Sequence, residues 1–288
     1  MTDGFINVLK APGMTSSNVV YDVRKLFSVK HAGHLGTLDP GAAGVLPVAL
    51  GRAAKLFDLL VDKDKTYIFE LAFGASTDTL DSYGSVTERA DCRISRAALE
   101  EVLPGFIGES LQRAPAYSAV KVDGRKMYDL ARAGEEVPER LRPITISELS
   151  LIEETGVNRF LLLMTCSRGT YVRVVAEDIA KKFSAPCYVS FLLRERSGPF
   201  STANAHSIAR LSGMRDAGTL NSAIIPCEAA LGFLPKIELP EHRRKAALNA
   251  LPTDGVIARD GLYRVYCSGF IGVGKVSDKS LRLTVHLD

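Results

Sequence analysis

The alternation of hydrophobic and polar side chains predicts strands in several parts of the chain. Residues 66–73 alternate with a period of two, so Tyr67, Phe69, Leu71 and Phe73 would share one face of a strand. Shorter apolar runs bounded by glycine or aspartate also have the composition of strands. These further strands are expected at residues 4–9, 160–166, 262–267, 270–276 and 281–287.

A period of three to four residues predicts helices between the strands. The strongest stripe follows residue 171 and is apolar at the positions that face the core in an amphipathic helix. Its members are Val172, Val175, Ala176, Ile179, Ala180 and Phe183. Residues 15–17 offer hydroxyl groups that cap the start of an earlier helix. Further helices are expected at residues 52–61, 95–103, 124–133 and 242–251.

Composition and charge mainly argue against a zinc-binding, a secreted or a membrane protein. The chain has 288 residues, of which 46% are hydrophobic, enough for one large globular domain and a small one. Its formal net charge of +3 is a weak pointer to an anionic partner. The five cysteines are widely spaced without a Cys-x-x-Cys pair, which favours free thiols over a zinc site. Because there is no signal pattern and no long apolar run, we expect a soluble cytoplasmic protein.

The candidate chemistry lies in residues 30–47, which contain four glycines and two prolines. Asp39 precedes Pro40, and a residue before proline is biased towards extended angles outside a helix. The segment would therefore present one carboxylate from a stiff loop, with His34 five residues upstream. Spacing alone leaves a plainer interpretation open, in which Asp39 caps a turn on a polar surface loop.

The stretch GHLGTLDPGAAGVLPVALGRAAKL, which starts at Gly33, resembles the signature of the TruB family of tRNA pseudouridine synthases. That signature reads Gly-His-x-Gly-(Thr/Ala)-Leu-Asp-Pro-x-Ala-x-Gly-(Val/Met)-Leu-Pro, which is too long for a chance match. The resemblance implies that Asp39 is the catalytic residue. It also suggests that His34 fills or braces the gap left when a base is flipped out of the RNA.

Further segments resemble the same family and suggest the walls of a uridine pocket. The Asp-Lys-x-Tyr context implies that Tyr67 lies against the target base, whereas the pattern alone fits a tyrosine at the edge of the core. Residues 166–173, Cys-Ser-Arg-Gly-Thr-Tyr-Val-Arg, imply that Tyr171 lines the pocket and that Arg173 pairs with Asp39. Without the resemblance, Arg173 would be an exposed arginine at a helix start, which the helix dipole slightly disfavours.

Residues 188–200 resemble the family's Leu-Arg-Arg segment and suggest Leu192 as the pocket leucine. Leu193 stands where the family often has arginine, and Glu195 where it often has threonine or leucine. These departures concern the outer edge of the pocket wall and not the nucleophile. Asp78 and Asp81 lack a third ligand, so Asx turns explain them better than a metal site does, and no metal is expected.

Contacts with RNA are expected in three places. The segment KAPGMTS, residues 10–16, resembles the opening of the family pattern, although a solvated lysine beside a turn explains Lys10 equally well. Residues 113–142 resemble a mobile insertion that closes over the tRNA arm, although a mixed-charge run usually marks a solvated surface. Residues 269–276, GFIGVGKV, resemble part of a PUA domain. The candidate RNA-binding residues are Lys10, Tyr117, Lys121, Arg125, Lys126 and Arg132.

The resemblance also implies a fold and a reaction. The fold is α+β, with a pseudouridine-synthase catalytic domain over residues 1–230 and a short PUA-like β domain over residues 231–288. The catalytic domain would have a mixed, mostly antiparallel central sheet flanked by helices. The reaction isomerises one uridine in the TΨC arm of tRNA to pseudouridine after base flipping, with Asp39 as nucleophile and no cofactor. The implied partner is the T-arm stem-loop of tRNA, with no membrane, no obligate protein partner and a monomeric state.

Two functions of other classes stay open at this point. The same surface could bind RNA without chemistry, as an RNA chaperone does, but the joint presence of Asp39, Tyr67 and Arg173 argues against it. A nucleosidase-like hydrolase could use Asp39 together with His34. Such a hydrolase would release free uracil, whereas an isomerase would not.

Overall fold

The computed structural model describes residues 3–115, 121–122, 124–127, 133, 135 and 140–287. The strands before residue 230 are β1 (Gly4–Lys10), β2 (Ala32–His34), β3 (Ala43–Leu50), β4 (Lys65–Phe73), β5 (Ala75–Thr77), β6 (Val86–Arg89), β7 (Gly108–Arg113), β8 (Lys121–Val122), β9 (Arg125–Lys126), β10 (Leu141–Gly156), β11 (Arg159–Cys166), β12 (Cys187–Ser197), β13 (Phe200–Ser201) and β14 (Ile224–Ile225). The later strands are β15 (Lys236–Glu238), β16 (Thr253–Asp254), β17 (Gly261–Tyr266), β18 (Phe270–Ser277) and β19 (Ser280–His286).

The helices are mostly short. The α-helices are α1 (Ser16–Phe27), α2 (Phe57–Val61), α3 (Arg96–Val102), α5 (Val172–Lys181), α6 (Ile208–Asp216), α7 (Cys227–Ala230) and α8 (Arg244–Leu248). Short stretches of 3-10 helix are η1 (Gly51–Leu56), η2 (Leu103–Phe106), η3 (Thr202–Asn204), η4 (Leu220–Ala223) and η5 (Glu241–Arg243). In the part of the chain that the structure describes, no helix is both long and apolar enough to cross a membrane.

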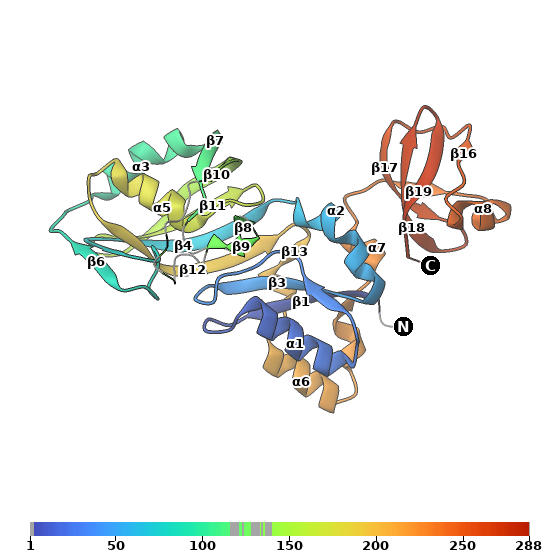
Figure 1. Ribbon diagram of the computed structural model, residues 1–288, viewed down its shortest axis with the longest axis horizontal. Coiled ribbons are helices and arrows are strands. Elements are labelled where there is room, and N and C mark those ends of the chain that lie inside the picture. The colour runs from blue at the N-terminus through green and yellow to red at the C-terminus, as the bar shows by residue number, and fades with distance from the viewer. Residues whose placement is uncertain are drawn as a thin grey trace.

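A large mixed sheet forms the body of the molecule (Figure 1). Its strands follow the order β14-β1-β3-β12-β4-β11-β10-β7, with β2 beside β3 and β13 beside β12. Neighbouring strands are antiparallel except β12 and β3, which pair in parallel where Leu193 faces Ala43 and Arg194 faces Gly44. The prediction of a mixed, mostly antiparallel central sheet is therefore confirmed. The parallel contact brings the loop that carries Asp39 beside the middle of β12.

Helices cover the sheet at both ends. Helices α1 and α6 lie side by side next to β1 and β3 (Figure 1), whereas α3 packs against β10 and α5 against β12 and β4. The start of α1 follows the sequence prediction, because the side chain of Thr15 accepts a hydrogen bond from the backbone N–H of Asn18 at 3.1 Å. Val19 and Val23 on α1 are fully buried against the sheet. The predicted apolar face of α5 is likewise buried.

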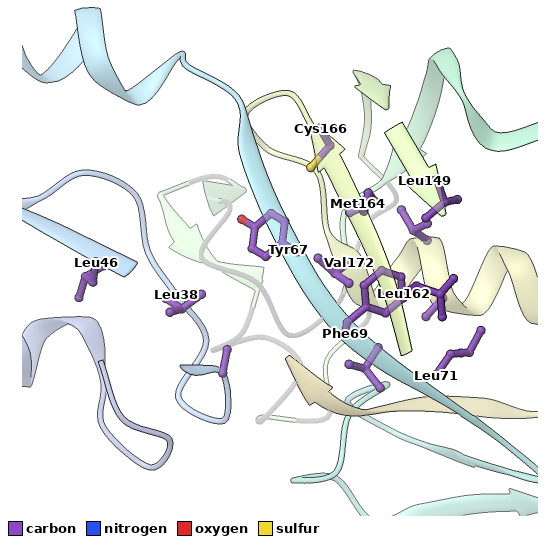
Figure 2. Close-up of a cluster of buried hydrophobic side chains, with 14 of the residues drawn as sticks. Leu38, Leu46, Tyr67, Phe69, Leu71, Leu149, Leu162, Met164, Cys166 and Val172 are labelled. Carbon is purple, nitrogen blue, oxygen red and sulfur yellow. The ribbon is translucent and has the colours of Figure 1, made fainter. Parts of the chain in front are cut away.

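The core follows the predicted face of β4. Tyr67, Phe69, Leu71 and Phe73 are all buried, and Phe69 and Leu71 have no exposed surface. Figure 2 shows Tyr67 and Phe69 on β4 next to Leu162, Met164 and Cys166 on the neighbouring strand β11. Because side chains two residues apart lie on the same face of a strand, one pattern read from the sequence accounts for this layer. The same cluster extends to α5 and α1, so a single core supports both walls of the cleft described below.

A second, five-stranded sheet follows, in the order β15-β17-β18-β19-β16. It stands at one end of the molecule in Figure 1, next to α8. An apolar cluster shared by Phe5 and Leu35 of the first sheet region and Val273 of β18 joins the two sheets. The three predicted strands in this region are present, as β17, β18 and β19. The division into domains at residue 230 and the PUA assignment stay predictions.

Three predicted helices differ from the structure. The helix expected at 52–61 begins as the 3-10 segment η1 and becomes α-helical only in α2. The helix expected at 242–251 is reduced to η5 and α8. The helix expected at 124–133 is wrong at its start, because residues 125–126 form β9 and pair with β8, and most of its remaining residues lie outside the described ranges.

Candidate active site

One cleft of about 870 Å³ gathers the pocket residues that the sequence suggested. Its walls come from the loop before β3, the start of β4, the turn after β5, the start of α5 and the middle of β12. Among its lining residues are His34, Asp39, Tyr67, Tyr171, Arg173 and Leu192. These positions are far apart in the sequence, so the sheet topology alone brings them together.

Asp39 and Arg173 form an ion pair in this cleft. Nη2 of Arg173 lies 2.8 Å from Oδ2 of Asp39, and the side chains of Arg173 and Asp39 are 5% and 35% exposed, respectively. The pairing that the family resemblance implied is therefore present. The alternative interpretation of Arg173 as an exposed helix-start arginine is wrong, because its side chain points inward from the first turn of α5 into the cleft.

The guanidinium of Arg173 is fixed on its other sides as well. Its Nη1 donates a hydrogen bond to the backbone carbonyl of Thr79 at 2.8 Å. Its Nε lies 3.8 Å from a carboxylate oxygen of Asp81. A planar guanidinium held at several points orients a carboxylate more strictly than a lone ammonium does. Asp39 therefore faces a cation whose position is set by a separate segment of the chain.

The loop of Asp39 is held by hydrogen bonds to its backbone. Ser16 Oγ donates to the carbonyl of Leu38 and accepts from the N–H of Leu38, both at 3.0 Å. The N–H of Gly13 donates to the carbonyl of Pro40 at 2.8 Å. Gly36 has a φ of +96°, an angle that favours glycine. The expectation of a stiff loop that presents one carboxylate agrees with these contacts.

Lys10 is buried beneath the loop that carries Asp39. Its side chain has no exposed surface, and Nζ donates to the carbonyls of Ala11, Met14 and Pro40 at 3.0, 2.8 and 3.1 Å. Burial lowers the pKa of the Lys10 ammonium to about 8, while the nearby charge of Asp39 opposes that shift. Three backbone carbonyls accept hydrogen bonds from this ammonium, so Lys10 braces the turn below Asp39. A contact between Lys10 and RNA stays a prediction.

Tyr67 is both a core residue and a cleft residue. It is 8% exposed, lines the cleft and lies across from Arg194 in the pairing of β4 with β12. Burial raises the pKa of the Tyr67 hydroxyl, and the adjacent guanidinium of Arg194 opposes that shift. Tyr67 is thus a core residue that also forms part of the cleft wall, and its contact with the target base stays a prediction.

Arg194 is the site residue that sequence reasoning missed. It is 1% exposed, and its guanidinium donates to the carbonyls of Val45, Thr37 and Gly36 at 2.8, 3.3 and 3.1 Å. It therefore ties β12 to the loop that carries Asp39. The only available signal was its place two residues after Leu192 in the segment that resembles the family, and that signal does not reveal burial.

His34 and Tyr171 are positioned by neighbours from other elements. His34 ends β2 and is half-buried, and burial, reinforced by Arg194, lowers its pKa. Gln112 holds the backbone of Tyr171, because its amide donates to the carbonyl and accepts from the N–H at 3.1 and 2.8 Å. The guanidinium of Arg142 lies 5.4 Å from the centre of the Tyr171 ring. Tyr171 is thus attached to β7 and β10 as well as to α5.

The remaining candidate RNA-binding residues belong to the insertion, which the described residues cover only in part. Arg125 is exposed on β9 and pairs with Glu135 at 2.8 Å. Lys121 and Lys126 face each other in the pairing of β8 with β9. Tyr117 and Arg132 lie outside the described residues.

Asp81, next to Arg173, forms an Asx turn as the sequence suggested, whereas Asp78 bonds across the loop to a residue seven positions later. Oδ1 of Asp81 accepts hydrogen bonds from the hydroxyl of Thr79 at 2.7 Å and from the N–H of Tyr83 at 3.0 Å. Oδ1 of Asp78 accepts from the N–H of Ser85 at 2.8 Å. Over the described ranges, no three His, Cys, Asp or Glu side chains gather as a metal site would require.

Comparison with known proteins agrees with this architecture. Residues 24–172 match the model of the TruB family pseudouridylate synthase N-terminal domain. tRNA pseudouridine synthase B of Caldanaerobacter subterraneus subsp. tengcongensis is 40% identical over 97% of this chain and 97% of its own length. The corresponding protein of Azoarcus sp. is 38% identical over 98% of this chain and 94% of its own length. A chain in an H/ACA RNP bound to a substrate RNA containing 2′-deoxyuridine has the same fold, with a TM-score of 0.74, 23% identity, and coverage of 99% of this chain and 84% of that chain.

These similarities first define a class. The family match and the curated relatives are those of pseudouridylate synthases, which are isomerases. More particularly, the chain belongs to the TruB family of these enzymes.

Proposed function

We propose that this enzyme isomerises one uridine in the T-arm of tRNA, at position 55, to pseudouridine. Relatives at about 40% identity are tRNA pseudouridine synthases, which supports tRNA as the substrate. The observation that carries the chemical part of the proposal is the Asp39–Arg173 ion pair at 2.8 Å within a cleft of about 870 Å³. A cleft of this size has room for one extruded nucleotide.

The reaction exchanges one glycosidic bond for another. The bond between C1′ and N1 of the uracil breaks, the base turns, and a bond forms between C1′ and C5. N1 gains a proton and C5 loses one, so the sum is an isomerisation without redox change or hydrolysis. No cofactor is needed for this balance.

Four side chains of the cleft are assigned roles in these reaction steps. Asp39 is the nucleophile or base, and it acts in the ionised form that a neighbouring guanidinium favours. Arg173 aims the carboxylate, because it is itself held by Thr79 and Asp81. Tyr67 and Leu192 line the cleft, and we assign the Tyr67 ring the stacking on the extruded uracil and Leu192 the apolar wall.

Base flipping must precede the chemistry. The target base is stacked inside a folded RNA, and its extrusion costs a few kcal/mol. His34 stands at the edge of the cleft, at the end of β2, and we assign it the filling of the gap in the RNA stack. Basic residues of the insertion around 113–142 and the second sheet supply phosphate contacts, which add affinity that falls with salt.

The test uses an unmodified tRNA transcript and the full chain. Pseudouridine should form at one position of the T-arm, and the other uridines of the transcript should stay unchanged. An RNA chaperone would bind the transcript and leave every uridine unchanged. A nucleosidase-like hydrolase would release free uracil, which chromatography of the supernatant detects. Either result would contradict the proposal.

A further inference from the structure

Tyr83 is an aromatic side chain at the mouth of the cleft that the reaction described above does not use. It lies in the turn between β5 and β6, lines the same cleft as Asp39 and is 61% exposed. By contrast, Tyr67 in the interior of the cleft is only 8% exposed. The two rings therefore occupy different depths of one cavity.

The ring of Tyr83 rests on the loop of Asp39. A methyl group built on the α-carbon of Gly41 would lie 2.4 Å from both Cδ2 and Cε2 of the Tyr83 ring. Approaches that short do not occur between real carbon atoms, so only glycine permits the ring to lie there. Part of the ring is thus covered by the backbone two residues after Asp39, and most of it is open to the cleft and to solvent.

The turn that carries Tyr83 is braced against the ion pair. The N–H of Tyr83 donates to Oδ1 of Asp81 at 3.0 Å, and the hydroxyl of Thr77 donates to the carbonyl of Asp81 at 2.7 Å. Arg173 in turn donates to the carbonyl of Thr79 in the same turn. The backbone of this turn therefore has a set position relative to Arg173, and the ring rests on Gly41, which limits what a ligand would have to order.

We infer that Tyr83 is a stacking platform for an unpaired nucleobase of the substrate RNA, other than the uracil that is isomerised. This inference rests on the proposed function, because the ligand is the same RNA. Extrusion of the target uridine removes the stacking partner of its neighbours, so a neighbouring base is free to find another flat surface. Base stacking on an aromatic side chain is favourable for every base, because each base has a π-face. An exposed, braced ring beside the cleft that receives the uracil meets that requirement.

The first experiment couples a protein change with an RNA change. Each unpaired nucleotide of a T-arm stem-loop is replaced in turn by an abasic nucleotide, and the affinity is measured for wild type and for Tyr83→Ala. In wild type, one abasic position away from the target should weaken binding by about 5- to 150-fold, the usual range for one stacked base. In Tyr83→Ala the same replacement should have little further effect, because the partner ring is already absent. Tyr83→Phe should retain the wild-type response, since the ring and not the hydroxyl makes the contact.

The second experiment uses the absence of tryptophan from the sequence. Tyr83→Trp introduces a single indole, whose fluorescence should be quenched when the stem-loop binds. The quenching should be absent when the bound RNA carries the abasic nucleotide at the position found in the first experiment. Val157→Trp is the matched control. Val157 is 86% exposed and lies in the turn between β10 and β11, at the opposite end of β11 from Cys166. Its fluorescence should not respond to the same RNA.

Three results would overturn the inference. They are equal abasic profiles for wild type and Tyr83→Ala, coupling at the target uridine itself, and no quenching at Tyr83→Trp under conditions where the RNA is bound. Isomerisation by the wild-type enzyme is measured separately on the unmodified stem-loop. If wild type forms pseudouridine and the coupling is missing, the stacking inference alone fails, whereas absence of pseudouridine would contradict the proposed function.

Discussion

The two sheet regions differ in whether they bury charged side chains. In the large sheet region, Lys10, Lys65, Arg173 and Arg194 are all buried. In the described part of the second sheet region, between residues 236 and 287, every buried side chain is apolar. Burying a charge costs free energy unless hydrogen bonds or an opposite charge offset the loss of water.

The buried cations are matched to partners that shape the site. Lys10 and Arg194 donate to backbone carbonyls around the loop of Asp39, and Arg173 pairs with Asp39 itself. Lys65 donates to the carbonyls of Val61 and Lys63 at the start of β4. The large sheet region thus uses buried polar contacts to position one carboxylate, while the second sheet region has an apolar core. Substitutions in the large sheet region should therefore mainly affect activity, and substitutions in the second sheet region should mainly affect stability.

The largest expected effect belongs to Asp39→Asn. The amide keeps the shape of the side chain and loses the nucleophile, so isomerisation should be abolished while tRNA affinity stays within a few fold. Single-turnover assays and filter binding measure the two quantities separately. Substantial turnover by the Asn variant would remove Asp39 from the mechanism.

In the second sheet, Ile271→Ala should lower stability and spare the chemistry. Ile271 has no exposed surface and belongs to the apolar cluster of this sheet. Replacement of a buried isoleucine by alanine typically costs about 2–5 kcal/mol. We expect an earlier thermal transition but an unchanged single-turnover rate at saturating tRNA and moderate temperature. A large fall in that rate would show that the second sheet takes part in the chemical step.

The buried charge of Lys10 should be visible in the pH dependence of stability. Its pKa is lowered from 10.5 to about 8 in the folded state, so between these values the unfolded chain binds more protons than the folded chain. Stability of the wild type should therefore rise with pH from about 8 to 10.5 relative to Lys10→Met, and the difference should be constant below pH 8. Denaturant titrations at a series of pH values give the slope. Equal slopes for both proteins would mean that Lys10 is not desolvated in the folded state.

The smallest expected effect concerns two basic residues of the insertion. Replacing Arg125 and Lys126 together by alanine should weaken tRNA binding and flatten the dependence of log K on log salt, by up to about 0.7–0.9 for each phosphate that is no longer neutralised. Arg96→Ala on α3 is the control, since Arg96 is also exposed and also pairs with a glutamate. An unchanged salt slope in the double variant would locate these residues away from the RNA.

Local patterns predicted part of the fold well. The alternation around Phe69 and the stripe around Val175 were enough for β4 and α5, and Thr15 marked the start of α1. No period predicted β10 or β12 as strands, and the structure supplies the reason. Both strands contain register shifts, for example between Val189 and Phe191, which break a period of two.

The residues of the candidate site were likewise only partly predictable from the sequence. The resemblance to the family was sufficient to suggest Asp39, Arg173 and the pocket residues, because these lie in long continuous motifs. It was not sufficient for Lys10 or Arg194. A lysine or an arginine is normally exposed, and its burial depends on carbonyl groups from segments far away in the sequence. Such partners leave no trace in local composition.

The orientation of Asp39 by Arg173 is tested most directly by the single-turnover rate of Arg173→Lys. Lysine keeps the positive charge beside Asp39 but loses the planar fork that binds Asp39 and Thr79 together. Because a small misplacement of a reacting group can cost about a hundredfold in rate, we expect a fall of that order with tRNA affinity little altered. Arg168→Lys is the matched control, since Arg168 lines the same cleft but pairs with the exposed Asp62, and its rate should be nearly unchanged. A near-wild-type rate for Arg173→Lys would contradict the claim that the buried guanidinium orients Asp39.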